Sequence, residues 1–263
     1  MVDAKVLLSR QKAVATITMN RPDSGNALDE QLKTELADAV IQVAEDTSVR
    51  AVLLTGAGKS FCVGQDLAEH AEALRNNATT AFDTIQEHYN PIVTGLATMP
   101  KPVVAAINGA CVGAGLGFAL ACDIRVAAVG ARFGTAFTSI GLTCDSGLSA
   151  SLARAVGATR ASELILLGEP FTAEQAAEWG MVGRVAPADE LAGTAAELAG
   201  RLSEGPTEAY AQAKRALLAA WQPPLSDVLR AESITQAKLG RTRDHRGAVE
   251  AFLAKEKPTF TGR

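Results

Sequence analysis

The feature that most constrains this chain is the stretch Lys101–Asp123, KPVVAAINGACVGAGLGFALACD. It opens with a short apolar run rich in β-branched residues, Val103–Ile107, which is typical of one buried strand. Asn108-Gly109 then ends the strand, and a glycine-rich loop leads into an apolar helix that we expect to begin near Phe118. A strand that passes through such a loop into a helix leaves backbone N–H groups unpaired at the helix N-terminus. Because no large side chain shields these groups, the stretch predicts a site for an anionic or polarised oxygen.

Length, composition and charge are those of a soluble, enzyme-like chain. The chain has 263 residues, of which 48% are hydrophobic and 21% charged, enough for a large core with an appendage. The net charge of −4 argues against general affinity for nucleic acid or a membrane surface, since both need a basic face. No apolar run reaches the roughly 18 residues of a transmembrane helix, and the N-terminus lacks the apolar core of a signal peptide.

The cysteines and histidines argue against a metal site. The four cysteines form no CxxC pair, and the three histidines are widely scattered. A chain with these thiols and no signal peptide is predicted to be reduced and cytoplasmic.

The periodicity predicts an α/β chain with two regions. We expect a ββα core at 1–195 and a helical region at 196–263, with Gly205-Pro206 and Pro223-Pro224 as breaks. Within the core, residues 68–90 are polar and predicted helical or mobile as far as Pro91. Other expected elements are a hairpin at 4–19 with its turn near 9–12, a helix at 30–45 capped by Asp29, strands at 49–55, 124–128 and 182–185, and helices at 148–155, 160–167 and 172–180.

Two nucleotide-binding motifs fail on spacing. Thr55–Ser60 resembles the end of a phosphate-binding P-loop, but Leu53 stands where that motif needs its first glycine, and an extended segment follows. Gly113–Gly117 has glycines at steps of two, so the dinucleotide fingerprint GxGxxG lacks its third glycine. A third interpretation pairs two turns, so that Gln65 and either Ala114 or Gly115 each present a backbone N–H to one oxygen. Each donor of such an oxyanion hole is worth about 3–4 kcal/mol, and the alternative is that both turns are purely structural.

The same two turns carry a family resemblance. Phe61–Leu67, followed by Asn108–Gly117 and Ala121–Asp123, resembles the crotonase (enoyl-CoA hydratase/isomerase) superfamily, and the resemblance runs from Asn20 to Lys255. It implies a crotonase/ClpP-like spiral of ββα units with a C-terminal helical region. It also implies an acyl-CoA thioester substrate, with CoA as part of the substrate and no separate cofactor. The expected assembly is a homotrimer, or a hexamer made as a dimer of trimers, with no nucleic-acid or membrane partner.

The resemblance also implies roles for particular residues. The oxyanion hole falls on Gln65 and Ala114, and Gly115 falls beside it in the substrate pocket. In the family a C-terminal segment, often from a neighbouring subunit, covers the adenine end of CoA, and Lys257 and Phe260 fall in that segment. It is an equally good interpretation that Lys257 is a solvated lysine and Phe260 a packed aromatic residue. The residues that fall where the family contacts CoA are Ala27, Lys59, Val63, Lys257 and Phe260.

The expected reaction follows from missing carboxylates. Hydratases of this family hold a water between two glutamates, and this chain has Gly117 and Phe137 at those positions. Water addition needs both a base and an acid, so hydration is disfavoured. Asp145 matches the place where some members carry a single catalytic aspartate. One carboxylate suffices to take a proton from one carbon and return it to another, while the oxyanion hole holds the enolate.

Asp145 has a second interpretation, as the N-cap of a helix that begins near Ser146. In the catalytic interpretation, its pKa is raised by desolvation against apolar pocket walls formed by Phe137, Ile140 and Leu142. Cys144 precedes it where related sequences have proline, which leaves the direction of the carboxylate open. Asp66, Asp123 and the pair His88-Tyr89 are interpreted as structural or pocket-lining.

The predicted function is therefore an acyl-CoA isomerase. Within the family the motifs are most similar to the isomerases that rearrange ring-epoxidised phenylacetyl-CoA and can also shift a double bond. The alternatives are an enoyl-CoA hydratase, which is a lyase, and a scaffold that binds acyl-CoA without turnover.

Overall fold

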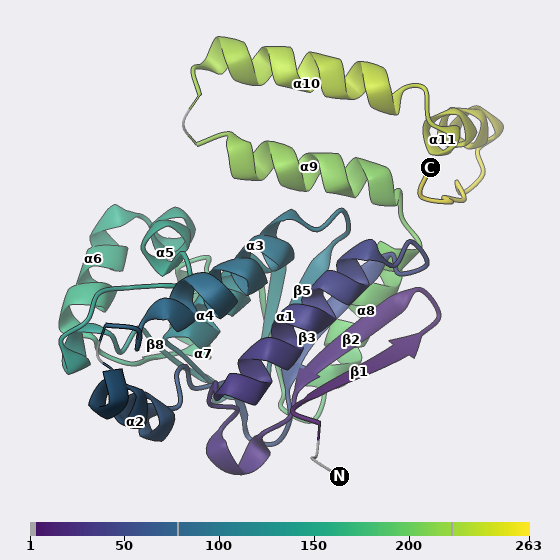
Figure 1. Ribbon diagram of the computed structural model, residues 1–263. Helices are drawn as coiled ribbons and strands as arrows, with labels where there is room; N and C mark the ends of the chain where they lie inside the picture. Colours follow the sequence, from purple (N-terminus) through teal and green to yellow (C-terminus); the bar gives the residue numbers. More distant parts are fainter. Residues whose placement is uncertain (1–3, 78, 222) are drawn as a thin grey trace.

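From β3 to β8, successive strands of this chain enter two different sheets in turn. Figure 1 shows the arrangement of the elements. The computed structural model describes residues 4–77, 79–221 and 223–263. The larger sheet has the order β1-β2-β3-β5-β7-β10, formed by Val6–Gln11, Val14–Met19, Ala51–Gly56, Val103–Ile107, Ile124–Ala128 and Arg184–Ala186. The smaller sheet has the order β4-β6-β8-β9, formed by Ser60–Cys62, Ala110–Val112, Arg132–Gly134 and Phe171–Thr172.

The alternation has a consequence for the ends of the strands. Each of β3, β5 and β7 is followed at once by a strand of the smaller sheet, which makes a spiral of repeating units. Within the smaller sheet β4 pairs parallel with β6, and β6 pairs parallel with β8. Because the strands run in one direction, the turns that leave them meet at a single edge of the sheet.

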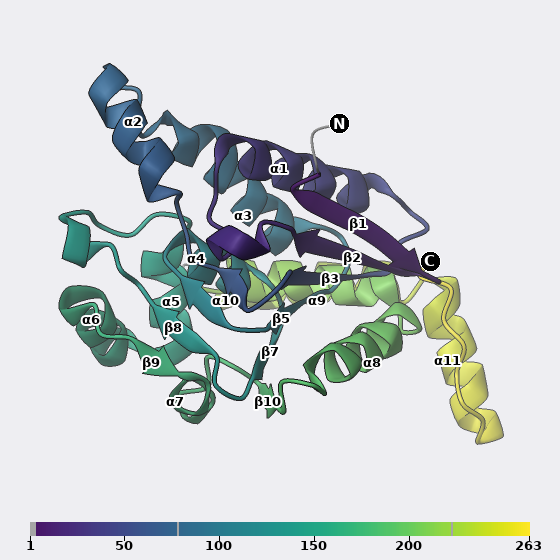
Figure 2. The ribbon, with the colours of Figure 1, turned by 90° about the horizontal axis from the view of Figure 1, so that it is seen from below.

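Helices cover both faces of the larger sheet (Figure 2). α1 (Glu30–Glu45) and α3 (Asn90–Thr98) lie on one face, and α8 (Leu191–Ser203) lies on the other, against β3, β5 and β7. The main apolar core lies under α1 and α3, and a smaller cluster lies under α8. The other helices of the core are α2 (Leu67–Asn77), α4 (Ala114–Ala121), α5 (Leu148–Val156), α6 (Ala158–Leu167) and α7 (Ala173–Glu178), with short helical turns η1 (Pro22–Ser24), η2 (Ile85–Tyr89) and η3 (Thr138–Ile140).

The C-terminal helices form an arm on the core: α9 (Thr207–Ala219), α10 (Leu225–Leu239) and α11 (Arg243–Ala254) (Figure 1). The buried Lys214 docks α9, because its Nζ donates to the Leu96 carbonyl at 2.7 Å and to Asp123 at 2.8 Å. The boundary predicted at residue 195 falls inside α8, which packs on the sheet of the core. The division into two regions therefore stays a prediction, and the arm itself begins after α8.

The sequence predicted most elements, with four differences. Asp29 caps α1 as expected, its Oδ1 accepting from Leu32 N at 2.9 Å. The turn of the hairpin lies at Lys12–Ala13, one or two residues later than predicted. Helix α4 begins at Ala114 and not at Phe118, because β6 occupies the segment after Asn108 and brings the chain to its turn sooner. Pro91 lies in the first turn of α3, where a missing N–H costs nothing, so it does not end a helix. Finally, the predicted strand 182–185 is the shorter β10 at Arg184–Ala186.

The described residues contain neither a membrane-spanning helix nor a cluster of metal-ligating side chains. No described helix is long and apolar enough to cross a membrane. Within the same ranges, no three His, Cys, Asp or Glu side chains lie close enough together to hold a metal ion. The thiols of Cys62 and Cys111 are fully buried, and burial raises the pKa of Cys62 to about 12, so the thiol stays protonated.

Candidate active site

The two glycine-containing turns lie side by side because β4 and β6 are neighbours. Cys62 and Cys111 are partners in the parallel pairing, and each strand ends within two residues of its turn. Gly64 and Gly113 both have positive φ, +86° and +57°, which favours glycine. A Cβ placed on Gly64 would lie 3.1 Å from the Val112 carbonyl oxygen and 3.6 Å from Ala114 N. The first turn therefore lies directly against the start of α4.

Two backbone N–H groups of these turns lack an acceptor among the residues that the structure describes. The residues on either side of Gln65 are hydrogen-bonded to Leu28, since Gly64 O accepts from Leu28 N and Asp66 N donates to Leu28 O. The N–H of Gln65 itself therefore points to the side opposite Leu28. Ala114 is the first residue of α4, where no carbonyl of the helix can accept from it. Both residues line one cavity, so the two donors are available to a ligand oxygen.

The cavity has a volume of about 710 Å³ and mostly apolar walls. Of the predicted site residues it is lined by Ala27, Val63, Gln65, Ala114, Phe137, Ile140, Leu142 and Asp145. Further lining residues that the sequence did not single out are Ser24, Leu67, His70, Ala81, Phe82, Thr84, Ile85, Thr135 and Ala136. Many of these lie in 67–85, a segment without motifs, so only its proximity to the cavity reveals them.

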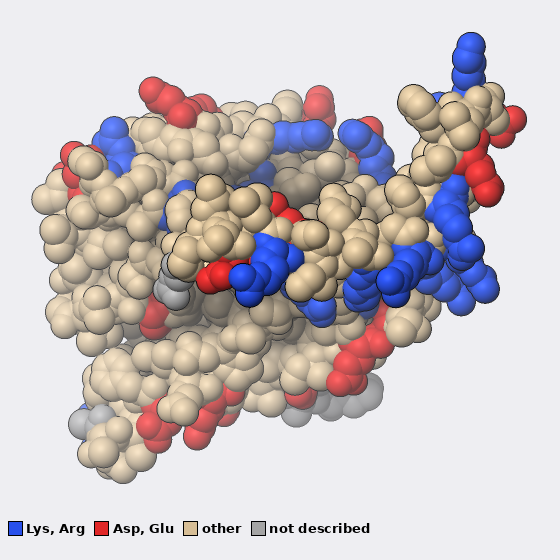
Figure 3. All heavy atoms as spheres, turned by 90° about the horizontal axis from the view of Figure 1, so that it is seen from above, with Lys and Arg blue, Asp and Glu red and all other residues tan. Residues whose placement is uncertain are grey.

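Four predicted residues do not line this cavity. Gly115 lies next to the β4 backbone, where a Cβ would come within 2.4 Å of the Cys62 carbonyl oxygen. Lys59 is exposed on the β3–β4 turn, and Lys257 is exposed beyond α11. Phe260 packs in a small pocket between α9 and α11, and its carbonyl accepts from Arg50. Lysine and arginine side chains lie along the arm toward its far end, among acidic ones (Figure 3). In the sequence, Lys257 follows Lys255 and Glu256, so this segment has mixed charge.

Gly117 has a packing role that the sequence did not reveal. A Cβ at this position would lie 2.5 Å from the Ser146 Cβ and 2.8 Å from the Ser146 carbonyl oxygen. Any side chain on α4 at this point would therefore overlap the 145–147 turn. The turn that carries Asp145 thus packs directly on α4 at the position where a hydratase would have a glutamate.

Asp145 is half-buried and has one side-chain hydrogen bond, accepted from Ser146 Oγ at 2.9 Å. Burial raises its pKa, and the Ser146 hydroxyl opposes that rise only in part. Desolvation by apolar neighbours was the predicted cause. The N-cap interpretation does not hold, because Gly147 is the N-cap residue of α5 and no side chain caps that helix; Asp145 bonds to α5 only through its backbone carbonyl, which accepts from Leu148 N at 2.9 Å.

The pKa of the other carboxylate of the cavity, Asp66, is shifted in the opposite direction. Burial favours its neutral form, but hydrogen bonds from Arg21 and from the first turn of α2 outweigh burial and lower its pKa. The ion pair to Arg21 measures 2.9 Å. Two carboxyl groups whose pKa values move in opposite directions are suited to different roles, and Asp145 is the one suited to accept and return a proton.

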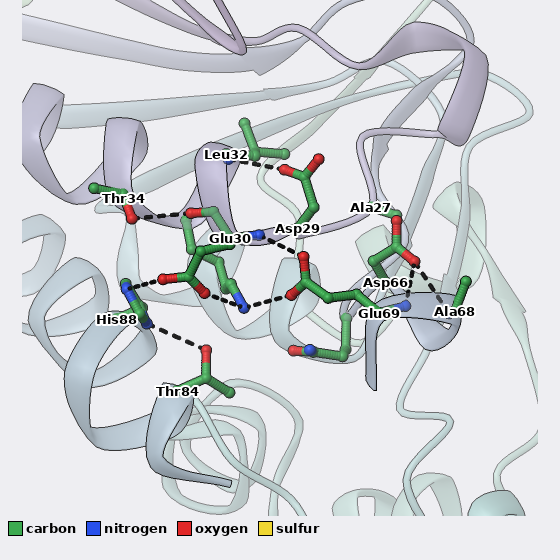
Figure 4. A network of polar contacts seen from close by, with 12 residues as sticks. Ala27, Asp29, Glu30, Leu32, Thr34, Asp66, Ala68, Glu69, Thr84 and His88 are labelled. Atoms are coloured by element: carbon green, nitrogen blue, oxygen red, sulfur yellow. Dashed lines mark hydrogen bonds and ion pairs between the residues drawn. The ribbon is translucent and has the colours of Figure 1, made fainter. Parts of the chain in front are cut away.

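Tyr89 is a buried member of the wall at 1% exposure, and its hydroxyl donates to Gln65 Oε1. Burial raises the pKa of Tyr89, and the negative charge of Asp145 adds to the effect, so the phenol stays neutral. Tyr89 is therefore pocket-lining, as the sequence analysis allowed. The neighbouring His88 points elsewhere, toward Thr84 and Glu30 (Figure 4). Asp123 accepts hydrogen bonds from the backbone of β5 and from Lys214.

The spiral of ββα units brings two N–H donors without acceptors and one half-buried carboxylate to the same mostly apolar cavity. The chain belongs to the enoyl-CoA hydratase/isomerase family, whose model matches residues 9–263. Enzymes of this family act on CoA thioesters, and the fold predicted from the sequence is confirmed.

Two relatives from Escherichia coli K12 differ in their reactions. The chain is 41% identical to 1,2-epoxyphenylacetyl-CoA isomerase, over 98% of each chain. It is 35% identical to 2,3-dehydroadipyl-CoA hydratase, over 99% of this chain and 100% of the relative. Among solved structures, an enoyl-CoA hydratase/isomerase from Mycobacterium abscessus superposes with a TM-score of 0.95 at 52% identity, covering 98% of this chain and 100% of that one. The family is therefore shown, while its members include both isomerases and hydratases.

Proposed function

We propose that this protein is an acyl-CoA isomerase that moves a double bond through an enolate, with Asp145 as its single acid and base. The observation that carries the proposal is the pairing of Asp145 with Gly117. The carboxylate lies in the cavity wall with a raised pKa, and the position of a hydratase glutamate is closed by Ser146.

The proposed reaction needs two proton transfers and no net change in composition. The Asp145 carboxylate takes a proton from C2 of a 3-enoyl thioester, and the N–H groups of Gln65 and Ala114 hold the dienolate oxygen. The Asp145 carboxylic acid then returns the proton to C4, which gives the conjugated 2-enoyl thioester. A raised pKa makes the Asp145 carboxylate a stronger base for the first transfer, and it keeps the proton on Asp145 until C4 of the dienolate takes it. No separate cofactor takes part in this scheme.

The hydratase alternative lacks its second carboxylate. Adding water requires a base for the water and an acid for C2. Phe137, 7% exposed, stands at the other glutamate position, and Asp66 is held by Arg21. The relatives include hydratases, so hydration is the reaction against which the proposal has to be measured. A non-catalytic scaffold is the third possibility, and turnover of any CoA ester excludes it.

The finer substrate proposal is the rearrangement of a ring-epoxidised aryl-acetyl-CoA, supported by the isomerase relative at 41% identity. We propose that Ala27, Val63 and Lys59 contact CoA, the first two from the cavity wall and the third from the exposed turn beside it. Lys257 and Phe260 lie on the arm, away from this chain's own cavity, so we propose that they cover the adenine end in a neighbouring subunit.

Exposed apolar side chains on the arm support the proposed trimer or hexamer. Leu217, Leu225 and Phe252 are 72%, 71% and 80% exposed, which is unusual for a surface that stays in water. Light scattering on a sizing column measures the assembly directly. A cytoplasmic location likewise stays a proposal.

The proposal is tested by assaying purified protein with 3-hexenoyl-CoA for isomerisation and with crotonyl-CoA for hydration. We expect kcat/KM to be higher for isomerisation, and Asp145→Asn to abolish it while acyl-CoA binding persists. Asp189→Asn, an exposed aspartate before α8, is the matched control and should keep full activity. Rapid hydration without isomerisation, or an active Asp145→Asn variant, would contradict the proposal.

A further inference from the structure

His70 is a polar side chain in the cavity wall that the proposed proton transfers do not use. It is half-buried on α2 and lines the cavity together with Gln65 and Asp145. Its ring packs edge-on against Phe82, with centroids 5.2 Å apart and an interplanar angle of 69°. Neither ring nitrogen has a hydrogen bond or an ion pair within the described residues.

The other histidine near the cavity, His88, has partners for both of its ring nitrogens. His88 Nδ1 lies 3.2 Å from Thr84 Oγ1 and its Nε2 lies 3.4 Å from Glu30 Oε1, so the fold uses both nitrogens (Figure 4). His88 is therefore explained by structure. His70 has no such partner among the described residues, and its side chain lines the cavity that a ligand would fill.

The part of α2 that carries His70 is held firmly to the core. Glu69, the preceding residue, pairs with Lys33 at 2.9 Å and accepts from Glu30 N at 2.8 Å (Figure 4). Lys33 is 2% exposed, and it is also 3.2 Å from a Glu30 carboxylate oxygen. Asp66, one turn earlier, caps α2 and pairs with Arg21. The imidazole is thus presented to the cavity from an anchored backbone, as a binding group must be.

Position along the cavity indicates which part of a ligand His70 meets. Ala27 and Val63, the proposed CoA contacts, line the cavity from the segments that follow η1 and β4. Phe82, against which His70 packs, belongs with Ala81 and Ile85 to the apolar wall beside α2 and η2. This wall is the one left for the acyl group, so the imidazole is directed at the acyl group and not at CoA.

We propose that His70 selects acyl groups that carry an oxygen beyond the carbons that react. This inference rests on the proposed function for the orientation of the substrate. An imidazole N–H donates to a hydroxyl, ether, epoxide or carboxylate oxygen. A plain hydrocarbon chain in the same place removes water from the ring nitrogens and offers no partner, which costs binding energy. The cavity therefore discriminates between oxygenated and plain acyl groups of equal length.

The test measures binding of saturated esters, which cannot react. Calorimetry gives Kd for hexanoyl-CoA and for 4-, 5- and 6-hydroxyhexanoyl-CoA with the full-length protein. We expect at least one hydroxy ester to bind about tenfold tighter than hexanoyl-CoA, and His70→Leu to reduce that preference to less than twofold. His70→Asn, which keeps a donor, should retain part of it. His245→Leu is the matched control, because His245 is exposed on α11 and should keep the full preference.

Two results would overturn the inference. One is a wild-type protein that binds all three hydroxy esters within twofold of hexanoyl-CoA. The other is a His70→Leu variant that folds, binds hexanoyl-CoA and keeps the wild-type preference. Because no turnover is required, a failed isomerase assay leaves this test valid, and a failed binding test leaves the role of Asp145 intact.

Discussion

Replacing Gly117 with alanine tests the link between α4 and the catalytic turn. The new Cβ would start 2.5 Å from the Ser146 Cβ, so the two atoms must separate by almost an ångström to reach an ordinary contact of 3.4 Å. Overpacking of this kind costs about 1–3 kcal/mol. Alanine recovers about 1 kcal/mol of helix propensity, so the net loss of stability is small. The effect on catalysis is larger than this net loss of stability, because a displacement of Asp145 by about 1 Å lowers the rate on the order of 100-fold.

The assay compares kcat for 3-hexenoyl-CoA with the free energy of unfolding for the same variant. We expect Gly117→Ala to lose about 100-fold in kcat while unfolding within about 2 kcal/mol of wild type. Gly193→Ala is the control, since Gly193 lies in α8 with open space around it, and it should be neutral or stabilising. Wild-type kcat in Gly117→Ala would refute the idea that this close approach positions Asp145. Gly117→Glu extends the test, and gain of hydration without loss of isomerisation would refute it equally.

Three further predictions follow from single side chains. Burial raises the pKa of Asp145 above its value in the unfolded chain, so the protein loses stability as the pH rises through the folded pKa and Asp145 ionises. Asp145→Asn should therefore have a higher melting temperature than wild type at neutral pH. A lower melting temperature would contradict a buried, unpaired carboxylate. Because the ordinary pKa of aspartate is about 3.9 and that of Asp145 is raised, kcat/KM should begin to fall with acid at a pH above about 4. A fall that begins only below pH 4 would exclude Asp145 as the base. Lys214→Met should lower the free energy of unfolding by about 3 kcal/mol, because it leaves Asp123 and the Leu96 carbonyl without their buried partner. Urea unfolding measures this loss. A loss under about 0.5 kcal/mol would show that other contacts dock α9.

The sequence predicted what depends on local pattern. Asp29 as a helix cap, the apolar strand Val103–Ile107 and the unpaired N–H groups after Gly113 all follow from short-range rules, and the structure contains each of them. The pairing of Gln65 with Ala114 was implied by the family resemblance. The structure supplies its physical cause, which is that β4 and β6 are adjacent parallel strands.

Features that depend on contacts between distant segments escaped prediction. Gly117 was noticed as a missing carboxylate, but its contact with Ser146 needs the packing of α4 on a later turn. Lys33 shares the buried face of α1 with Leu36 and Val40, and the carboxylate that pairs with it there comes from Glu69 on another helix. Gly115 was assigned to the pocket, whereas the close approach of Cys62 places it in the packing behind. In each case the role of the residue depends on a segment, distant in the sequence, that packs against it.

The most direct test of the central claim follows the proton itself. A 3-hexenoyl-CoA deuterated at C2 is converted in ordinary water, and the 2-hexenoyl product is analysed for deuterium at C4. Because one half-buried carboxylate takes and returns the proton, we expect a measurable share of the product to carry deuterium at C4. Complete replacement by solvent hydrogen at C4, with turnover intact, would contradict transfer by Asp145 alone.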